Sequence, residues 1–384
     1  MLELGIDELN IVLQPAYDDV GDDLGLYTWP DLASCMIATA ADAMEFGAVF
    51  GPARELSKRP AGYGEAVTYG EHGFYLAAAF NPGSPSQGVI FTFSAQALAW
   101  WRERTGREVW ELLQLVQRQD LYSARVSRID LTADFLDEGI TVQAIHDGLL
   151  SGELTAHRRQ TGKGGAVQVR AWKWKPCGYM SGGEVETVYL GSRAANTGGF
   201  LRIYDKKREQ ERTRGAYLAK AHGCADWVRF EARLLTDNAH SFGYELVKCG
   251  SDDDMKRLVA HVFADRYIFR EGNAGSLAPW SAALAAAAGN PSSVLLSSPS
   301  TRNHDLAAKL DHVAESSGLV SLLHRAQGVW GDGAPEAIMG YLLALADERC
   351  PNRETRAWVN SYADVYRRDF ADVNLWLSMD VAAA

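Results

Sequence analysis

Apolar and polar residues alternate with a period of two in three segments near the middle of the chain. This period predicts β-strands, because successive side chains of a strand point to opposite faces of a sheet. The segments are 122–136 (YSARVSRIDLTADFL), 187–206, which is typical of a hairpin with turn chemistry over 194–199, and 227–235 (WVRFEARLL). In each segment one face is apolar and the opposite face carries ionisable side chains.

The flanking patterns predict an α+β fold, in which helices surround an antiparallel sheet. Residues 64–93 contain three further short strands separated by turn residues. Helical periodicity follows possible caps at Asp31, Ser94 and Thr141, and it extends over 33–46, 95–105, 108–119 and 142–150. We therefore predict an N-terminal α+β region (1–119), a core (120–250) and a helical C-terminal region (251–384) that serves assembly or oligomerisation.

Charge is distributed unevenly along this acidic chain. The net charge is −11, yet residues 155–220 contain 14 Lys and Arg against 5 Asp and Glu. A concentrated basic block on an acidic protein indicates a local site for anions such as phosphates. A solvated basic loop is the alternative. The five cysteines form no CxxC pair, and no long apolar run or basic signal-peptide flank occurs, so we expect a cytoplasmic protein without a membrane span.

The ionisable strand faces carry the candidate chemistry. On the hairpin Arg202, Tyr204 and Lys206 share one face, and a tyrosine between cations suits attack on a phosphodiester. A solvent-facing strand with an amphipathic tyrosine is the alternative. The other two strands offer the carboxylates of Asp130, Asp134 and Glu231. Such carboxylates bind either a divalent cation, Mg²⁺ or Mn²⁺, or neighbouring Arg and Lys side chains.

The basic block supplies the candidate contacts to DNA. Interleaved tryptophans and cations suit stacking on bases and contact with the backbone of a single strand. A basic edge strand is the alternative. TGKGGA at 161–166 lacks the spacing of a nucleotide-binding P-loop. The predicted DNA-binding residues are Arg158, Arg159, Lys163, Arg170, Trp172, Lys173, Lys175, Arg193 and Lys207.

Three motifs occur in an order that resembles a known family. They are RIDLTADF, then TVYLGSRAANTGGFLRIYDKK, then WVRFEARL, and the resemblance covers about 63–235. The combination is similar to the replication initiation factor (Rep-trans) family of rolling-circle initiators from plasmids and filamentous phages, together with related relaxases. The resemblance implies an antiparallel-sheet nickase core, nicking of one strand at an origin, a covalent 5′-phosphotyrosine and a divalent metal.

Residue by residue, the resemblance assigns Tyr204 as nucleophile, Lys206 as the lysine that follows it, and Asp130 and Glu231 as acidic metal positions. Asp134 fits a second acidic position less closely, and Tyr189 is the second candidate nucleophile. The expected partner is origin DNA, as a single strand or hairpin, with a homodimer and a host helicase as further partners. A mobilisation relaxase and a DNA-binding regulator without catalysis are the alternatives.

Overall fold

A computed structural model of the chain describes residues 1–15, 28–161, 167–172, 174–175, 180–181, 183–191, 199–272, 275–289, 310, 313, 319–348, 359, 363, 367 and 372–374. The chain divides into two compact units, Met1–Ser297 and Ser298–Ala384. The first unit contains the candidate site.

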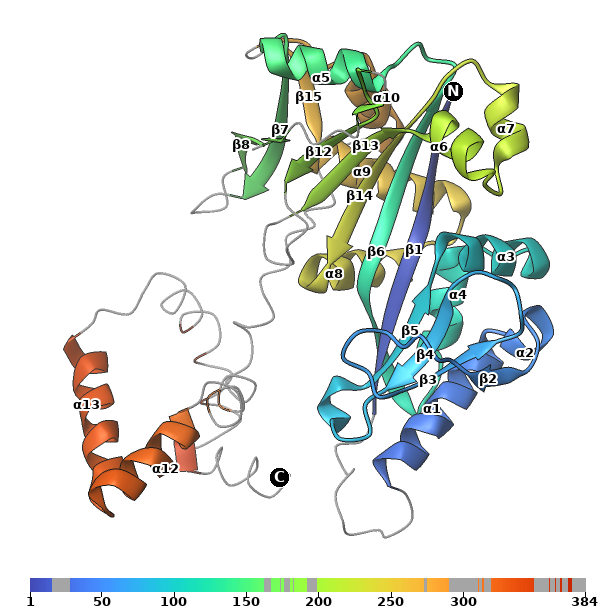
Figure 1. Ribbon diagram of the computed structural model, residues 1–384. Coiled ribbons are helices and arrows are strands. Elements are labelled where there is room, and N and C mark those ends of the chain that lie inside the picture. Colours follow the sequence, from blue (N-terminus) through green and yellow to red (C-terminus); the bar gives the residue numbers. More distant parts are fainter. Residues whose placement is uncertain are drawn as a thin grey trace. The chain divides into compact units, whose positions relative to one another are not determined.

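One ten-stranded sheet, antiparallel throughout, forms the frame of the first unit (Figure 1). In spatial order its strands are β2 (Ala53–Glu55), β3 (Glu65–Tyr69), β4 (Leu76–Phe80), β5 (Val89–Phe93), β1 (Leu2–Pro15), β6 (Tyr122–Leu136), β14 (Trp227–Leu235), β13 (Phe200–Asp205), β12 (Thr187–Gly191) and β9 (Trp174–Lys175). A smaller sheet has the order β15 (Ile268–Glu271), β7 (Leu154–Thr161) and β8 (Val167–Ala171), and β10 (Met180–Ser181) pairs with β11 (Glu184–Val185).

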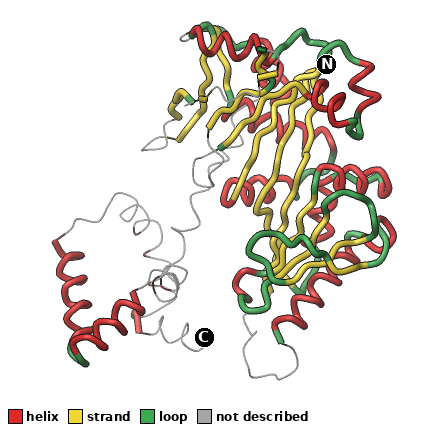
Figure 2. Tube along the Cα trace, in the orientation of Figure 1, coloured by secondary structure: helices red, strands yellow, loops and turns green. Residues whose placement is uncertain are grey.

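The two central strands, β1 and β6, pair with each other along almost their whole length. β5 pairs with β1 only from Leu9 to Leu13, so β2–β5 extend the sheet at one end. β14 pairs with β6 from Leu136 to Arg128, so β12–β14 extend it at the other end. Figure 2 shows the resulting two groups of strands joined through the long pair. The unit therefore consists of two lobes that share one sheet.

Helices flank the sheet. α1 (Trp29–Ala43), α2 (Phe46–Val49), α3 (Ala95–Thr105) and α4 (Val109–Gln117) belong to the lobe of β2–β5, which also has a 3₁₀ turn at Pro85–Gln87. The other lobe has α5 (Val142–Ser151), α6 (Lys206–Thr213), α7 (Leu218–Gly223), α8 (Thr236–Leu246), α9 (Asp252–Arg266) and α10 (Pro279–Ala288). Buried side chains of α1, α4, α8 and α9 join those of β1, β6 and β14 in one hydrophobic core.

The α+β prediction with an antiparallel sheet and flanking helices is confirmed. The helix predicted over 33–46 begins earlier, at Trp29, because Thr28 and Asp31 form a capping box and Pro30 between them favours the first helical turn. The predicted C-terminal region begins at 251, whereas α9, β15 and α10 belong to the first compact unit. The described part of the second unit contains α12 (Leu319–Trp330) and α13 (Ala334–Glu348). The sequence pattern of residues 305–317 also predicts a helix, and most of these residues lie outside the described part of the chain.

From the sequence, no membrane-spanning segment is expected. Among the residues that the structure describes, every helix is too short or too polar to cross a bilayer.

Candidate active site on the polar face of the sheet

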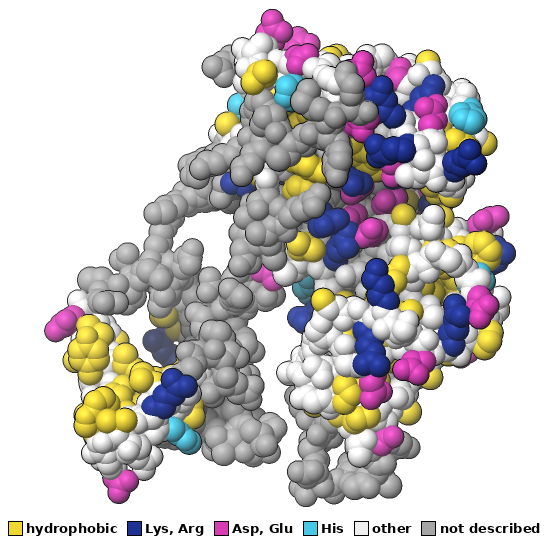
Figure 3. All heavy atoms as spheres, viewed as in Figure 1, with side chains coloured by type: hydrophobic (Ala, Val, Ile, Leu, Met, Phe, Trp, Pro, Cys, Tyr) yellow, Lys and Arg dark blue, Asp and Glu magenta, His cyan; other side chains and the backbone are white. Residues whose placement is uncertain are grey.

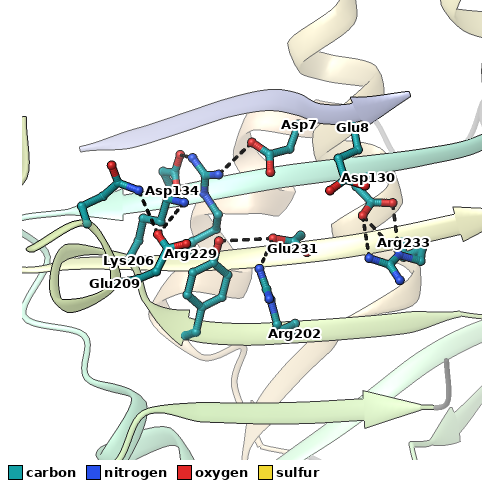
Figure 4. A network of polar contacts seen from close by, with 12 residues as sticks. Asp7, Glu8, Asp130, Asp134, Arg202, Lys206, Glu209, Arg229, Glu231 and Arg233 are labelled. Atoms are coloured by element: carbon teal, nitrogen blue, oxygen red, sulfur yellow. Dashed lines mark hydrogen bonds and ion pairs between the residues drawn. The ribbon is translucent and has the colours of Figure 1, made fainter. Parts of the chain in front are cut away.

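Three adjacent strands place ionisable residues on one face of the sheet. β13, β14 and β6 are neighbours, and their antiparallel registers place the polar-face residues of each strand opposite those of the next. The aligned rows are Arg202–Glu231–Thr132, Tyr204–Arg229–Asp134 and Arg233–Asp130. The residues predicted on separate strands from their alternation therefore lie on one common face (Figure 4).

The opposite face of the same strands belongs to the hydrophobic core. Leu201, Ile203, Phe230, Leu131 and Ala133 are completely buried there. Removing these side chains from water fixes the register, because a slip by one residue would exchange the two faces. The core thereby determines which side chains meet on the polar face.

A β-bulge in β1 adds two carboxylates that the sequence analysis did not assign. Ile6 pairs with Leu131 and Glu8 with Asp130, so Asp7 is an extra residue between them. Asp7 accepts a hydrogen bond from Arg229 at 3.0 Å, and Glu8 forms an ion pair with Arg128. The sequence carries a signal for this bulge, because the buried Ile6 and Leu9 are three positions apart and break the period of two.

Tyr204 lies in the middle of the polar face. Its Oη donates to Glu231 Oε2 at 3.2 Å, and Arg202 Nη2 donates to the same oxygen at 2.7 Å. The Arg202 guanidinium lies 4.1 Å from the centre of the Tyr204 ring, and Lys206 Nζ lies 5.6 Å from it. The phenol, the carboxylate and the two cations expected around it therefore form one contiguous group.

The acidity of Tyr204 differs from what the neighbouring cations alone suggest. Burial raises the pKa of Tyr204 well above its ordinary value, and the nearby Glu231 carboxylate raises it further. Arg229 and Arg202 act in the opposite direction but do not outweigh burial. Only 5% of Tyr204 is exposed, so its phenol is protonated at neutral pH and needs a proton acceptor before it can attack.

Glu231 is the acceptor that the geometry supplies. Burial also raises the pKa of the Glu231 carboxyl, against the opposing effect of Arg202. Both donors reach Oε2, and no described residue donates to Oε1. A carboxylate with a raised pKa that touches a phenol is typical of a catalytic base.

Asp130 and Asp134 are engaged by arginines. Asp130 is 1% exposed, and its two oxygens accept from Arg128 (Nε to Oδ1 3.0 Å, Nη2 to Oδ2 2.6 Å) and from Arg233 (Nη2 to Oδ2 3.0 Å). Asp134 accepts from Arg229 at 2.7 and 2.8 Å and from the Trp227 indole at 2.8 Å. Two-point pairing of this kind satisfies both carboxylates within the protein.

These pairs bear on the expected divalent metal. Mg²⁺ and Mn²⁺ need several oxygen ligands that face one point. The oxygens of Asp130 and Asp134 instead face guanidinium groups, and among the described residues no group of three or more His, Cys, Asp or Glu is arranged to hold a metal ion. In this arrangement the three carboxylates predicted to bind a metal, Asp130, Asp134 and Glu231, do not form a metal site. They pair with arginine side chains instead, which is the alternative that the sequence allowed.

The two lysines after the tyrosine have different surroundings. Lys206 is the first residue of α6; it is buried and pairs with Glu209 at 2.7 Å. Lys207 donates to the carbonyl oxygens of Cys224 at 2.7 Å and Ala225 at 3.2 Å. Lys206 thus belongs to the group around Tyr204, whereas Lys207 ties α6 to the residues after α7.

The residues predicted to contact DNA are placed unequally. Trp172 is buried, its ring stacks on Tyr267 at 5.5 Å, and Arg158 lies 4.6 Å above it, so Trp172 has a packing role. Arg159 is exposed and pairs with Asp265 at 2.9 Å. The structure describes only the backbone of Arg170 in β8 and of Lys175 in β9, while Lys163, Lys173 and Arg193 lie outside the described residues.

Part of this chain is similar to a known protein family. Residues 124–304 match the family model of the replication initiation factor. This part of the chain, 181 of the 384 residues, is similar to the replication initiation factor family. The resemblance seen in the three motifs is thereby confirmed, and the matched residues include Tyr204, Glu231 and Asp130.

A solved structure is similar in fold to this chain. It is that of a rolling circle replication initiator protein from Geobacillus stearothermophilus, with a TM-score of 0.50 and 15% sequence identity. The likeness covers 75% of this chain and 97% of that chain. No curated protein matches the chain. At this identity the likeness concerns the fold alone.

Proposed function

We propose that this chain is a rolling-circle DNA replication initiator that nicks and rejoins one strand at an origin. The match of residues 124–304 to the family model of the replication initiation factor supports the role in replication initiation. The observation that supports the chemistry is the contact of Tyr204 with Glu231, with Arg202 bound to the same carboxylate oxygen. A hydrolase that uses water needs no buried tyrosine of this kind, whereas a strand-transfer enzyme does.

In the proposed reaction Tyr204 Oη attacks the phosphorus of the scissile phosphodiester. The new O–P bond forms while the bond from phosphorus to the 3′ oxygen breaks, and that oxygen leaves as a 3′-hydroxyl after taking up a proton. The product is a 5′-phosphotyrosine diester, which keeps the energy of the broken bond. Attack by the 3′-hydroxyl on this diester reverses the step, so nicking and rejoining use the same group.

Glu231 takes the proton from Tyr204 in this scheme. The hydrogen bond from Oη to Oε2 is already formed, so the transfer needs no rearrangement of either side chain. Arg202 stabilises the carboxylate before the transfer and meets the charge on the phosphoryl oxygens afterwards. Lys206 adds a second cation near the ring.

A requirement for Mg²⁺ or Mn²⁺ comes to this proposal from the family resemblance alone. The carboxylates as arranged do not form a metal site, and no step above depends on a metal. The proposed partner is origin DNA in the cytoplasm, with a homodimer and a host helicase as additional expectations. Relaxase activity would use the same chemistry at a transfer origin.

The decisive experiment is the capture of a covalent adduct. The protein is incubated with Mn²⁺ and a labelled single strand that carries its own origin, and the products are separated in a denaturing gel. We expect an adduct with wild type and with Tyr189→Phe, and none with Tyr204→Phe. Tyr189 is a matched control, because it lies opposite Arg202 on β12 and its ring stacks on Phe200.

Three other outcomes would change the proposal. An adduct with Tyr204→Phe but not with Tyr189→Phe would make Tyr189 the nucleophile. Absence of any adduct, with tight binding to origin strands, would favour a regulator without catalysis. A parallel reaction with a chelator in place of Mn²⁺ tests the metal requirement, and an undiminished adduct there would refute it.

A further inference from the structure

A cleft of about 760 Å³ opens beside the candidate active site. Its walls come from both lobes and include Arg102 of α3, Lys256 of α9, and Tyr217 and Lys220 around the start of α7. Its floor is the first half of β1, from Leu2 to Asp7. Figure 1 shows α3 and α7 on the same side of β1, one beside each half of the strand. A volume of this size is ordinary for a site that binds a small molecule or part of a polymer.

The cleft lies at an edge of the sheet. β5 pairs with β1 only from Leu9 onward, so the Leu2–Ile6 stretch has β6 as its single strand partner among the described residues. Backbone groups on that edge therefore face the cleft and offer hydrogen bonds to a ligand. An open edge between two lobes also admits a chain that continues on both sides, as a nucleic-acid strand does.

One aromatic side chain stands exposed in the cleft wall. Tyr217 is 41% exposed, although its backbone amide is held by the Gln210 side chain at 2.9 Å. Its ring packs edge-on against Trp227, with 6.4 Å between the ring centres. Tyr217 is therefore a fixed ring that presents its remaining surface to the cleft, which is the arrangement that stacks an unpaired base.

Cations accompany the exposed ring. Lys220 lies 4.8 Å from the centre of the Trp227 ring and pairs with Glu3, Arg102 pairs with Glu108, and the exposed Lys256 lines the same cleft. Carboxylates line the cleft as well: those of Glu3, Asp7, Asp134 and Asp253. On the face that Figure 3 shows, Lys and Arg side chains are interspersed with acidic ones over this unit. A uniformly positive surface potential therefore does not account for DNA binding on this face. The local feature that suits a single strand is the stacking ring beside the exposed Lys256, with Lys220 and Arg102 able to exchange their carboxylate partners for phosphates.

The cleft reaches the group around Tyr204. Arg229 and Asp134 form part of its lining, and Arg229 lies directly opposite Tyr204 in the register of β13 and β14. A strand bound in the cleft would thus pass next to the nucleophile. Resting on the proposed function, we propose that this cleft binds a single-stranded nucleotide beside the scissile phosphate, with its base stacked on Tyr217 and its phosphates near Arg102, Lys220 and Lys256.

Binding is measured by fluorescence anisotropy with a fluorescein-labelled oligo(dT) strand of about 20 nucleotides, longer than one stacking groove covers. All variants carry Tyr204→Phe, so that no covalent product forms. We expect Tyr217→Ala to raise the Kd about tenfold, the order found for loss of one stacked base, and Tyr217→Phe to bind as the parent does. Lys256→Gln should lower the salt dependence of binding by about one released counterion.

Tyr244→Ala is the matched control. Tyr244 is also an exposed tyrosine beside a lysine, Lys248, but it lies on α8 outside the cleft. An unchanged Kd for Tyr217→Ala, or an equal loss with Tyr244→Ala, overturns the inference. Equal weakening for a labelled duplex also overturns it, because a stacking site requires an unpaired base. Unchanged thermal unfolding of Tyr217→Ala shows that the loss is local.

The binding experiment on the cleft and the adduct experiment on the proposed function can succeed or fail independently. The anisotropy experiment reports non-covalent binding, whereas the adduct experiment reports attack by Tyr204. A Tyr217 effect without any adduct would keep the cleft and reject the nicking chemistry. An adduct without a Tyr217 effect would keep the nicking chemistry and reject the cleft.

Discussion

At the scale of single residues, burial decides the behaviour of Tyr204. Cations near a phenol lower its pKa in water, and Arg202 and Arg229 do act in that direction. Burial acts against them and prevails, so the phenol stays neutral. In the proposed reaction the attack by Tyr204 therefore depends on a proton acceptor, Glu231, rather than on a preformed phenolate. Arginine contributes by holding that acceptor in place.

The pH dependence of adduct formation tests this role of Glu231. The carboxyl must be ionised to accept a proton, and burial raises its pKa above the ordinary value for glutamate. Adduct formation should therefore fall as pH decreases through that raised pKa. Glu231→Gln should be slower by about 10²- to 10⁴-fold, the usual contribution of a general base, and should lose this acidic limb.

Initial rates of adduct formation across acidic and neutral pH provide the measurement. Glu211→Gln is a suitable control, since Glu211 is an exposed residue of α6 outside the group around Tyr204. If Glu231→Gln keeps the wild-type profile while Tyr204→Phe abolishes the adduct, another group accepts the proton.

At the scale of elements, alternation predicted the site well where the strands are regular. Asp130, Thr132 and Asp134 on β6, and Glu231 on β14, face the side that the pattern indicated. The pattern placed Val126 with them, but a register shift between Arg128 and Val126 turns Val126 into the core. The extra residue of a bulge exchanges the faces on which the following residues lie. A strict period of two therefore assigns those residues to the wrong face.

The sequence pattern also could not predict which residues of neighbouring strands lie opposite each other. Alternation shows that Asp134 and Arg229 are each on a polar face, but only the register shows that they lie opposite each other and bind. The choice between a metal and arginine pairing for the carboxylates depended on that register. The same holds for Asp7, which reaches Arg229 only because β1 bulges.

The bulge in β1 gives a prediction about two deletions. Removing Asp7 leaves Leu2, Leu4 and Ile6 on the core side, because the pairing becomes regular, although Arg229 loses one partner. Removing Gly5 instead exchanges the faces of residues 2–4 and turns Glu3 toward the core. We expect the Gly5 deletion to lower the free energy of unfolding by about 2 kcal/mol more than the Asp7 deletion, since it buries a carboxylate.

Urea denaturation of both deletion variants measures the difference. Replacement of Asp7 by Ser, which keeps the extra residue, separates loss of the Arg229 contact from loss of the bulge. Equal stability of the two deletion variants would show that β1 tolerates either facing, contrary to the role of the core in fixing its register.

At the scale of the whole molecule, β1 and β6 make the two lobes of the first unit interdependent. Both strands contribute to the one hydrophobic core that extends through the two lobes, and both carry polar residues at the candidate site. The sequence predicted a boundary between an N-terminal region and a core at 119/120. In the structure the strands on the two sides of this boundary pair in one sheet. Unfolding one lobe would remove strand partners from the other, so we expect the lobes to unfold together.

A chain that ends at Ser297 tests this view of the molecule. Because residues 1–297 form one compact unit with its own core, we expect this fragment to fold and to unfold in one transition, with tryptophan fluorescence and far-ultraviolet circular dichroism coincident. Its midpoint in urea should equal that of the corresponding transition in the full chain. Separate transitions for the two probes would mean that the shared strands do not couple the lobes. A lower midpoint would instead assign residues 298–384 a stabilising role, and the adduct yield of the same fragment would show whether the candidate site needs them.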